Sequence, residues 1–245
     1  MIERFWAVIP GGGHGRRFES PIPKQYSNLA GSAVLDHVLE CFLKMNEFEA
    51  VVVAIHKEDQ RFTGLHHAHD SRVFAVTGGS ERADSVLAGL QWLNANGADH
   101  NDWVFVHDAA RPLVIESELS ALMSALEQPE CPGVVLAVPV ADTLKLVNKV
   151  DARAEIPITC VGETLDRSQL WHAMTPQVFR LGALRSALTV ASDRGFAVTD
   201  DSQAMESVGV FPWLVRGRRS NIKLTYSEDS ELIEAILLAR RTAVV

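Results

Sequence analysis

The sequence predicts an α/β fold in which a mostly parallel, twisted sheet carries helices on both faces and a β arm protrudes from it. Three observations support this prediction. Short runs rich in Val and Ile alternate with segments of helical spacing along most of the chain. These runs are apolar on both alternating faces, which is typical of strands buried between two layers of helices. The alternation ends after Val138, where a more polar stretch begins.

Five apolar runs are predicted to be strands of the sheet: Phe5–Ile9, Ala50–Ile55, Val73–Val76, Trp103–Val106 and Val134–Val138. Between them, three segments place their apolar residues on one helix face each. These three sets are Leu35, Val38, Leu39, Phe42 and Leu43; Val86, Leu87, Leu90 and Leu93; and Leu119, Leu122, Met123 and Leu126. Strands and helices in this order give parallel strands joined by right-handed crossovers. Ligands of such sheets bind at the carboxyl ends of the strands, so the loops that follow strands are the candidate functional segments.

Residues 140–172 are expected to leave the main domain as a β-hairpin arm, because they are polar and show only short alternating stretches. Leucines at helical spacing predict a helix over 181–195, and a strand is expected at Trp213–Val215. A final helix is predicted over 228–241, with a capping-box pattern at its start and two arginines at its end. We therefore expect one domain over residues 1–245, with the arm as an excursion from it.

The composition is that of an ordinary globular protein, with 47% hydrophobic and 22% charged residues. The 23 basic and 31 acidic residues give a formal net charge of −8. A general nucleic-acid-binding face is not expected, because such faces need clustered excess Lys and Arg. The three cysteines, Cys41, Cys131 and Cys160, form no CxxC pair, which favours a reducing cytoplasm. No apolar stretch approaches the roughly 18 residues of a membrane helix.

A glycine-rich loop follows the first predicted strand over Pro10–Phe18. Its spacing matches neither the dinucleotide fingerprint, because Arg16 stands where the third glycine belongs, nor a Walker loop. Arg16, Arg17 and Lys24 place three cations in or near this loop within an acidic protein. The pattern favours a polyphosphate site whose main chain approaches the ligand closely. The alternative is a flexible turn with solvated arginines.

Two further loops follow predicted strands. Gly78–Arg82 opens the helix that carries Ser85, and its N–H groups could bind an anion or the edge of a base, although an ordinary turn would look similar. Asp108 closes the Trp103–Val106 strand, and an aspartate there can face Mg²⁺ that bridges phosphates. Arg111 could pair with an anionic substrate group. The alternative is that Asp108 only caps the next turn.

Other segments are less specific in isolation. Asp166-Arg167 and Trp171–Gln177 end the excursion, and Thr199–Ser202 is equally consistent with a helix N-cap. Lys223, within Asn221–Thr225, could be a surface lysine. The histidines of His66–His69 have no Cys or carboxylate partner at metal-ligand spacing, so we interpret them as a solvated loop.

Taken together, these segments resemble the 2-C-methyl-D-erythritol 4-phosphate cytidylyltransferases of non-mevalonate isoprenoid synthesis. The resemblance covers nearly the whole chain, and the motifs occur in the order of the family. They are Pro10–Arg17, Pro23–Tyr26, Glu81–Val86, His107–Pro112, Asp142-Thr143, Asp166-Arg167, Trp171–Gln177 and Asn221–Lys223. The resemblance implies a Rossmann-like nucleotidyltransferase fold and the transfer of CMP from CTP to methylerythritol phosphate, with release of diphosphate.

The resemblance also implies a role for each matching residue. The catalytic residues would be Arg17, Lys24, Arg167 and Lys223. The CTP site would comprise Gly11, Gly12, Gly13, Gly79, Ser80, Ser85, Ala109 and Thr175. The methylerythritol phosphate would be bound by Asp108, Arg111, Thr143, Arg167 and Lys223. Asp108 would also face Mg²⁺, an ion held mainly by the triphosphate. The arm would clasp a second subunit, which makes the expected enzyme a homodimer.

Two departures from the family pattern are visible. Gly11-Gly12-Gly13 stands where the family commonly has Ala-Ala-Gly, and Ser80 stands where Asp or Ala is expected. A cytidylyltransferase for ribitol phosphate shares much of the pattern and is the nearest alternative. A sugar-1-phosphate nucleotidyltransferase fits the contexts of Arg111 and Arg167 less well. A nucleotide-binding module without catalysis is the alternative from another class, and the joint presence of Arg17, Lys24, Asp108 and Lys223 argues against it.

Overall fold

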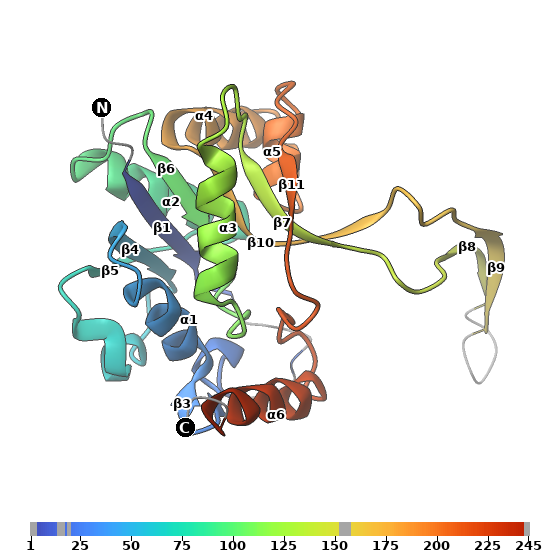
Figure 1. The fold of residues 1–245 in the computed structure, drawn as a ribbon, viewed down its shortest axis with the longest axis horizontal. Helices are drawn as coiled ribbons and strands as arrows, with labels where there is room; N and C mark the ends of the chain where they lie inside the picture. The colour runs from blue at the N-terminus through green and yellow to red at the C-terminus, as the bar shows by residue number, and fades with distance from the viewer. Residues whose placement is uncertain (1–3, 14–17, 19–20, 152–157, 243–245) are drawn as a thin grey trace.

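The computed structural model describes residues 4–13, 18, 21–151 and 158–242. Its centre is a seven-stranded sheet in the order β11-β7-β10-β6-β1-β4-β5 (Figure 1). The strands are β1 (Phe5–Pro10), β4 (Phe48–Ile55), β5 (Val73–Thr77), β6 (Trp103–Val106), β7 (Val134–Pro139), β10 (Trp171–Arg180) and β11 (Trp213–Arg216). All neighbouring strands are parallel except β10, which is antiparallel to both β6 and β7. The predicted α/β fold with a mostly parallel sheet is confirmed.

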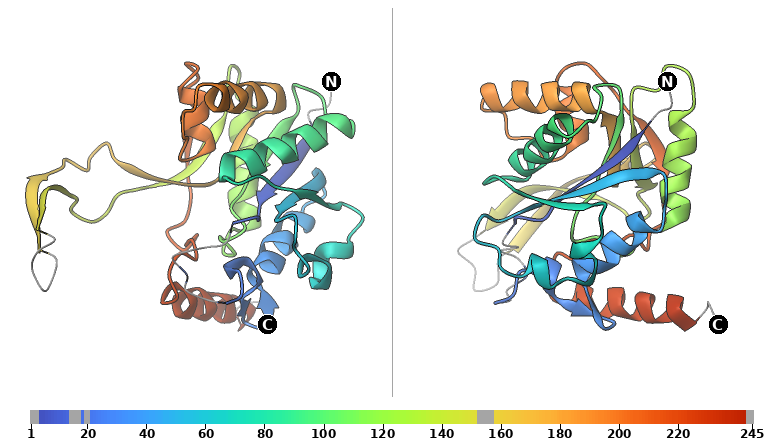
Figure 2. Two further views of the ribbon diagram at one scale, coloured as in Figure 1. Left: turned by 180° about the vertical axis from the view of Figure 1, so that it is seen from behind. Right: turned by 90° about the vertical axis from the view of Figure 1, so that its left-hand side faces the viewer.

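Helices cover both faces of this sheet (Figures 1 and 2). They are α1 (Val34–Leu43), α2 (Arg82–Ala95), α3 (Glu116–Leu126), α4 (Leu181–Asp193), α5 (Asp201–Glu206) and α6 (Asp229–Thr242). Alternate residues of β1 show the two-sided burial: Ala7 and Ile9 pack in the core under α1 and α3, while Trp6 and Val8 pack under α2, α4 and α5. The apolar runs at β1, β4, β6 and β7 are strands buried on both sides for this reason, whereas β5, at the edge of the sheet, is largely exposed.

The predicted elements correspond closely to the observed ones, but several observed elements were not predicted, among them strand β10 and helix α5. The central strand β10 was not predicted, because its first half closes the polar excursion and its sequence includes Pro176. Its antiparallel place between β6 and β7 is fixed by the route of the chain back from the arm and not by local patterning. The short helix α5 was foreseen only as an N-cap: Asp200 accepts the N–H of Gln203 at 2.9 Å.

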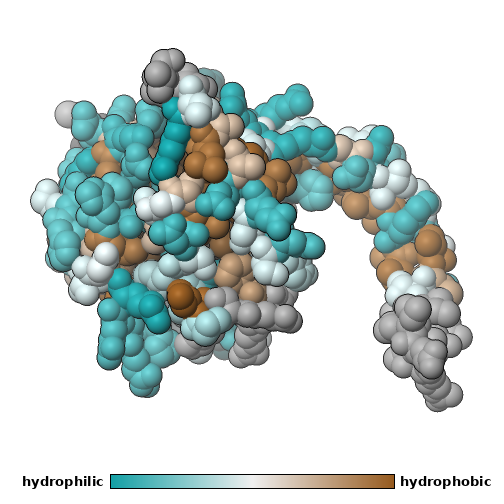
Figure 3. All heavy atoms as spheres, turned by 90° about the horizontal axis from the view of Figure 1, so that it is seen from below, coloured by the Kyte–Doolittle hydropathy of each residue, from teal (hydrophilic) through white to brown (hydrophobic). Residues whose placement is uncertain are grey.

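The expected arm is present. It leaves the body after β7, forms the two-stranded ribbon of β8 (Lys145–Asp151) and β9 (Ile158–Thr164), and returns into β10 (Figure 1). Seen from below, the ribbon stands well away from the body and carries apolar side chains on its surface (Figure 3). Leu146, Val147 and Val161 are about half exposed there. An apolar surface of this kind on a protruding ribbon is typical of an interaction surface.

A third core cluster lies under the C-terminal helix α6, near the hairpin of β2 (Asn28–Leu29) and β3 (Ser32–Ala33). Leu224, Ile233 and Leu237 pack there against Leu29 and Phe18. This packing holds the segment that precedes α6 close to the loop after β6, where Leu224 N–H donates to the carbonyl oxygen of Ala110. Within the described part of the chain, no helix is long and apolar enough to cross a membrane.

Candidate active site

The loops that follow β1, β5 and β6 meet at the carboxyl ends of these strands and line a pocket. Residues of the 3-10 turn η1 (Lys24–Tyr26) and of the segment before α6 complete its walls. The lining residues are Pro10, Gly11, Gly12, Gly13, Lys24, Gln25, Gly79, Ser80, Glu81, Arg82, Ser85, Asp108, Ala109, Ala110 and Lys223. The pocket lies where parallel sheets bind their ligands. Its glycines and cations suit a phosphorylated ligand.

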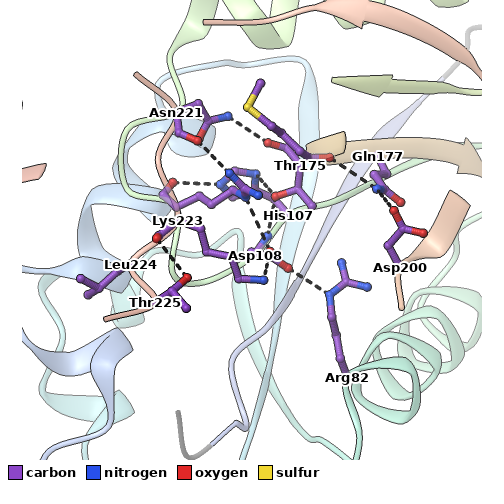
Figure 4. A network of polar contacts seen from close by, with 12 residues as sticks. Arg82, His107, Asp108, Thr175, Gln177, Asp200, Asn221, Lys223, Leu224 and Thr225 are labelled. Carbon is purple, nitrogen blue, oxygen red and sulfur yellow. Dashed lines mark hydrogen bonds and ion pairs between the residues drawn. The ribbon is translucent and has the colours of Figure 1, made fainter. Parts of the chain in front are cut away.

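The carboxylate of Asp108 is the centre of an ion-pair cluster in this pocket (Figure 4). Oδ2 lies 2.6 Å from Nζ of Lys223 and 3.6 Å from Nε of Arg111, and Oδ1 lies 3.0 Å from Nε of Arg82. Burial alone would raise the pKa of Asp108, but these three cations hold it well below its usual range. Asp108 is therefore ionised at physiological pH, and Lys223 belongs to the pocket instead of being a remote surface lysine.

Arg82, the first residue of α2, connects Asp108 to a second carboxylate. One terminal nitrogen of its guanidinium donates to Oδ2 of Asp201 at 2.8 Å, and Asp201 is fully buried at the start of α5. Burial acts to lower the pKa of Arg82, but the two carboxylates raise it above its ordinary value. Arg82 belongs to the Glu81–Val86 motif, but its role was not predicted from the sequence. The signal available in the sequence was its position in a loop that follows a predicted strand, since such loops meet at the carboxyl edge of the sheet.

His107 is fully buried one residue before Asp108, and its two ring nitrogens have different partners. The carbonyl oxygen of Arg111 lies 3.1 Å from Nε2, and Oγ1 of Thr175 lies 3.1 Å from Nδ1. Because the carbonyl can only accept, Nε2 carries the proton, and the Thr175 hydroxyl donates to Nδ1. The same hydroxyl oxygen accepts the main-chain N–H of Asp108 at 3.0 Å. Thr175 therefore fixes the backbone of Asp108 from behind the pocket.

Asn221 extends this network to the segment before α6. Its Nδ2 donates to the main-chain carbonyl oxygen of Thr175 at 3.0 Å. Its main-chain carbonyl oxygen accepts from the guanidinium of Arg111 at 2.8 Å (Figure 4). Asn221 is itself almost fully buried. The end of β6, strand β10 and the segment carrying Lys223 are thus tied together beneath the ion-pair cluster.

The buried imidazole of His107 predicts a pH dependence of stability. Burial lowers its pKa to about 4, against about 6.5 for a histidine in an unfolded chain. Between these values the unfolded chain binds a proton on His107 that the folded chain does not. The stabilisation is therefore complete above pH 6.5 and is lost as the pH falls towards 4, by about 3 kcal/mol in all.

Urea unfolding of the wild type and of His107→Gln should show this effect. Glutamine offers a donor and an acceptor but does not titrate. The free energy of unfolding of His107→Gln should therefore fall less between pH 7 and pH 4 than that of the wild type. His66→Gln makes the same substitution at an exposed histidine and is the matched control. A pH slope that is the same for all three proteins would contradict the buried neutral state of His107.

The glycine loop after β1 is fixed at its first residue. Gly11 donates its N–H to the carbonyl oxygen of Ala54 at 2.7 Å, and its own carbonyl oxygen accepts Nε2 of the buried Gln25 at 2.6 Å. A Cβ at Gly11 or Gly12 would meet its nearest neighbours at 3.4 and 3.5 Å, which is ordinary van der Waals contact. Alanines would therefore fit at both positions, and the departure from Ala-Ala-Gly has no steric origin in this loop.

The loop after β5 is packed more tightly. A Cβ at Gly79 would lie 2.2 Å from Cβ of Asp84, so this position requires glycine. The hydroxyl of Ser80 donates to the Asp84 carboxylate at 3.1 Å, and that carboxylate also accepts the N–H of Glu81. Ser80 thus supports the first turn of α2, while its main chain remains at the pocket.

Comparison with known proteins identifies the family. A family model described as 2-C-methyl-D-erythritol 4-phosphate cytidylyltransferase matches residues 5–239. The chain belongs to this family. It is 46% identical over 241 residues to the family member from Pseudomonas entomophila, covering 98% of this chain and 99% of that protein. It is 47% identical over 230 residues to a member from Pseudomonas putida, covering 94% of each chain.

Solved structures of cytidylyltransferases share the fold. The crystal structure of the Francisella tularensis 2-C-methyl-D-erythritol 4-phosphate cytidylyltransferase superposes with a TM-score of 0.77 at 32% identity, covering 94% of this chain and 98% of that chain. A crystal structure of a 4-diphosphocytidyl-2C-methyl-D-erythritol synthase gives a TM-score of 0.79, also at 32% identity, over 97% and 100% of the two chains. The Rossmann-like nucleotidyltransferase fold implied by the resemblance is confirmed.

The site residues expected for a cytidylyltransferase fall into three groups. Those that line the pocket are Gly11, Gly12, Gly13, Lys24, Gly79, Ser80, Ser85, Asp108, Ala109 and Lys223. Arg111 and Thr175 contact Asp108 from behind it. Thr143 and Arg167 are exposed on the arm, where the Arg167 guanidinium donates to the carbonyl oxygen of Ala141. Arg17 lies outside the described residues. The roles of all these residues remain predictions.

Proposed function

We propose that this pocket is where the chain carries out the reaction of its family. That reaction transfers CMP from CTP to 2-C-methyl-D-erythritol 4-phosphate, giving 4-diphosphocytidyl-2-C-methyl-D-erythritol and diphosphate for isoprenoid precursor synthesis. The chain is a cytidylyltransferase by family membership. The observation that supports this location is the meeting of a glycine loop with the cations of Lys24, Arg82 and Lys223 in one pocket.

The chemistry requires positioning and charge neutralisation more than proton transfer. A phosphate oxygen of methylerythritol phosphate attacks the α-phosphorus of CTP, and the bond from that phosphorus to the bridging oxygen of the β-phosphate breaks. The nucleophile is already largely ionised near neutral pH, since the second pKa of a phosphate monoester is about 6. No general base is needed, and the obstacle is the repulsion between two anions.

The lysines of the pocket are placed to reduce this repulsion. Lys24 reaches the pocket from η1, and Nζ donates to the carbonyl oxygen of Leu224 at 2.9 Å. This contact holds the ammonium in the pocket before the ligand arrives. Lys223 is held there by Asp108. We assign to Lys24 the role of neutralising the negative charge that grows on the α-phosphate and the leaving diphosphate. We assign to Lys223 the role of binding the phosphate of the acceptor.

Mg²⁺ is the divalent cation proposed for the reaction. The carboxylates that line the described pocket are Asp108 and Glu81, and no described group of three His, Cys, Asp or Glu residues could hold a metal alone. Mg²⁺ at nucleotide sites takes one or two carboxylates and completes its shell with phosphates and water. This donor set fits an ion held mainly by the triphosphate, with Asp108 facing it. When bound, the ion supplies further neutralisation of phosphate charge.

The arm is proposed to dock on a second copy of the chain, so that the enzyme is a homodimer. Its exposed apolar residues Leu146, Val147 and Val161 support this, since such a surface is stabilised by burial. Thr143 and Arg167 are exposed on the same arm and do not line the described pocket of their own chain. Both would then contribute to the site of the partner.

Mixing two inactive variants tests this arrangement. Lys24→Ala and Arg167→Ala are expected to be inactive as separate homodimers. After exchange of subunits, a heterodimer would combine the intact Lys24 of one chain with the intact Arg167 of the other. Random pairing should restore about one quarter of the wild-type activity, because half of the dimers regain one of two sites. Absence of recovery in a confirmed heterodimer would place Arg167 in the site of its own chain.

The function itself is tested by diphosphate release from CTP and Mg²⁺ with either methylerythritol 4-phosphate or ribitol 5-phosphate as acceptor. Release with the methylerythritol ester alone is the expected result. Release with ribitol phosphate alone would keep the fold and the mechanism but change the acceptor. No release with either acceptor would indicate a nucleotide-binding module.

A further inference from the structure

The turn η1, which carries Lys24, has little structure of its own. It is a three-residue 3-10 turn without a side-chain cap. Its main-chain hydrogen bonds run from the N–H of Tyr26 to the carbonyl oxygen of Pro23 and from the N–H of Ser27 to that of Lys24. Short 3-10 turns have poor hydrogen-bond geometry and depend on their surroundings. The position of Lys24 is therefore set by what the side chains of this turn contact.

The three side chains of η1 contact three different segments. Lys24 Nζ donates to the carbonyl oxygen of Leu224, and Gln25 Nε2 donates to that of Gly11. The third contact leaves the pocket: the hydroxyl of Tyr26 donates to Oδ2 of Asp59 at 2.8 Å, in the loop after β4. Leu224 and Gly11 accept these two bonds with main-chain groups of the pocket walls. The bond of Tyr26 joins two side chains, so it can be removed from either end.

Asp59 is itself held firmly. Its Oδ1 accepts the N–H groups of Arg61 and Phe62, both at 2.9 Å, and its own N–H donates to the carbonyl oxygen of His56 at 2.9 Å. Phe62 is buried in the core under α1. The Tyr26 ring packs against the same core. The tyrosine is thus anchored at its ring and at its hydroxyl.

The hydroxyl of Tyr26 is a donor throughout the working range of pH. Burial, and then the hydrogen bond to Asp59, raise the pKa of Tyr26 above its ordinary value. An ionised carboxylate is an acceptor only, so the shared proton of the Tyr26–Asp59 hydrogen bond stays on the tyrosine oxygen. Because both partners of this hydrogen bond are anchored, it fixes the position of Tyr26. The turn η1 cannot fix that position by its own main-chain hydrogen bonds.

We propose that Tyr26 is a positioning residue for CMP transfer: its hydroxyl, held by Asp59, sets where η1 places Lys24 and Gln25 in the pocket. The inference rests on the proposed role of Lys24. If Lys24 neutralises charge that grows in the transition state, a small displacement of η1 lowers kcat and leaves substrate binding almost unchanged. A purely structural role for Tyr26 would lower the melting temperature without this split between kcat and KM.

Tyr26→Phe removes the hydroxyl alone and is the decisive variant. In the diphosphate-release assay we expect kcat to fall about tenfold, with the KM values for CTP and methylerythritol phosphate within about twofold of the wild type. Tyr226→Phe removes the hydroxyl of the other tyrosine, which is half exposed in the segment before α6, and should keep the wild-type kcat. An unchanged kcat in Tyr26→Phe, or a raised KM at constant kcat, would overturn the inference.

A double-mutant cycle tests whether the effect passes through Asp59. Asp59→Ala should lower kcat at least as much as Tyr26→Phe, and the double variant should be no slower than Asp59→Ala alone, because both changes remove one hydrogen bond. Losses that multiply would show that Tyr26 and Asp59 act independently and would overturn the inference. A wild-type chain that releases no diphosphate would overturn the proposed function as well, whereas an active wild type with an equally active Tyr26→Phe would overturn only this inference.

Discussion

Replacing Lys24 by alanine should lower kcat for CMP transfer by about 10²- to 10³-fold, the usual cost of removing one stabiliser of transition-state charge. The Nζ group donates to a main-chain carbonyl oxygen at the pocket wall, and water can replace this contact when the side chain is truncated. The fold should therefore persist. Single-turnover release of diphosphate, with saturating CTP and acceptor, measures the chemical step directly.

Lys44→Ala is the matched control for this variant. Lys44 lies at the end of α1 and pairs with Glu40 at 2.9 Å, and it does not line the pocket. Its loss should leave kcat at the wild-type value. Both variants should keep the wild-type melting temperature to within a few degrees. Near wild-type turnover in Lys24→Ala would contradict charge neutralisation by this residue.

The largest effect on stability is expected for Arg82→Met. This change leaves Asp201 without its ion-pair partner and takes one of three cations from Asp108. Breaking a buried pair by removing one partner costs about 3–5 kcal/mol, because the other charge stays buried and uncompensated. Urea unfolding at neutral pH should show a loss of this size in the free energy of unfolding.

Two further variants show whether the loss comes from Asp201. Asp201→Asn removes the uncompensated charge, so Arg82→Met combined with Asp201→Asn should recover part of the stability that Arg82→Met loses. Arg185→Met changes a partly exposed arginine on α4 and should shift the free energy of unfolding by no more than about 0.5 kcal/mol. If the double variant is less stable than Arg82→Met alone, the charge of Asp201 is not the cause.

Much of the fold could be predicted from the sequence because buried strands and amphipathic helices leave periodic patterns. The runs at β1, β4, β5, β6 and β7 are apolar on both faces and were recognised for that reason. Strand β10 was not predicted, because its neighbours in the sheet are set by the route of the chain through the arm. A position that depends on a long-range connection leaves little trace in local periodicity.

The site was predictable to the same extent. Lys24, Asp108 and the glycines lie in loops directly after or near strands, where position alone suggests function. Arg82 and Asp201 were missed as a pair, because the two residues are far apart in the sequence and meet only when α2 and α5 pack on the same face. Lys223 looked like a surface lysine in isolation, and its partner Asp108 lies more than a hundred residues earlier.

The carboxylate of Asp108 has a consequence for which molecules can enter the pocket. Without a ligand, the Asp108 carboxylate already forms an ion pair with Lys223, and Oδ2 lies 2.6 Å from Nζ. A monovalent anion in solution offers that ammonium no more charge than Asp108 already provides, so it gains little by competing. A nucleoside triphosphate brings several negative charges at once and can engage the cations around Asp108 together. We therefore expect the pocket to discriminate between anionic ligands by their number of negative charges as well as by their shape.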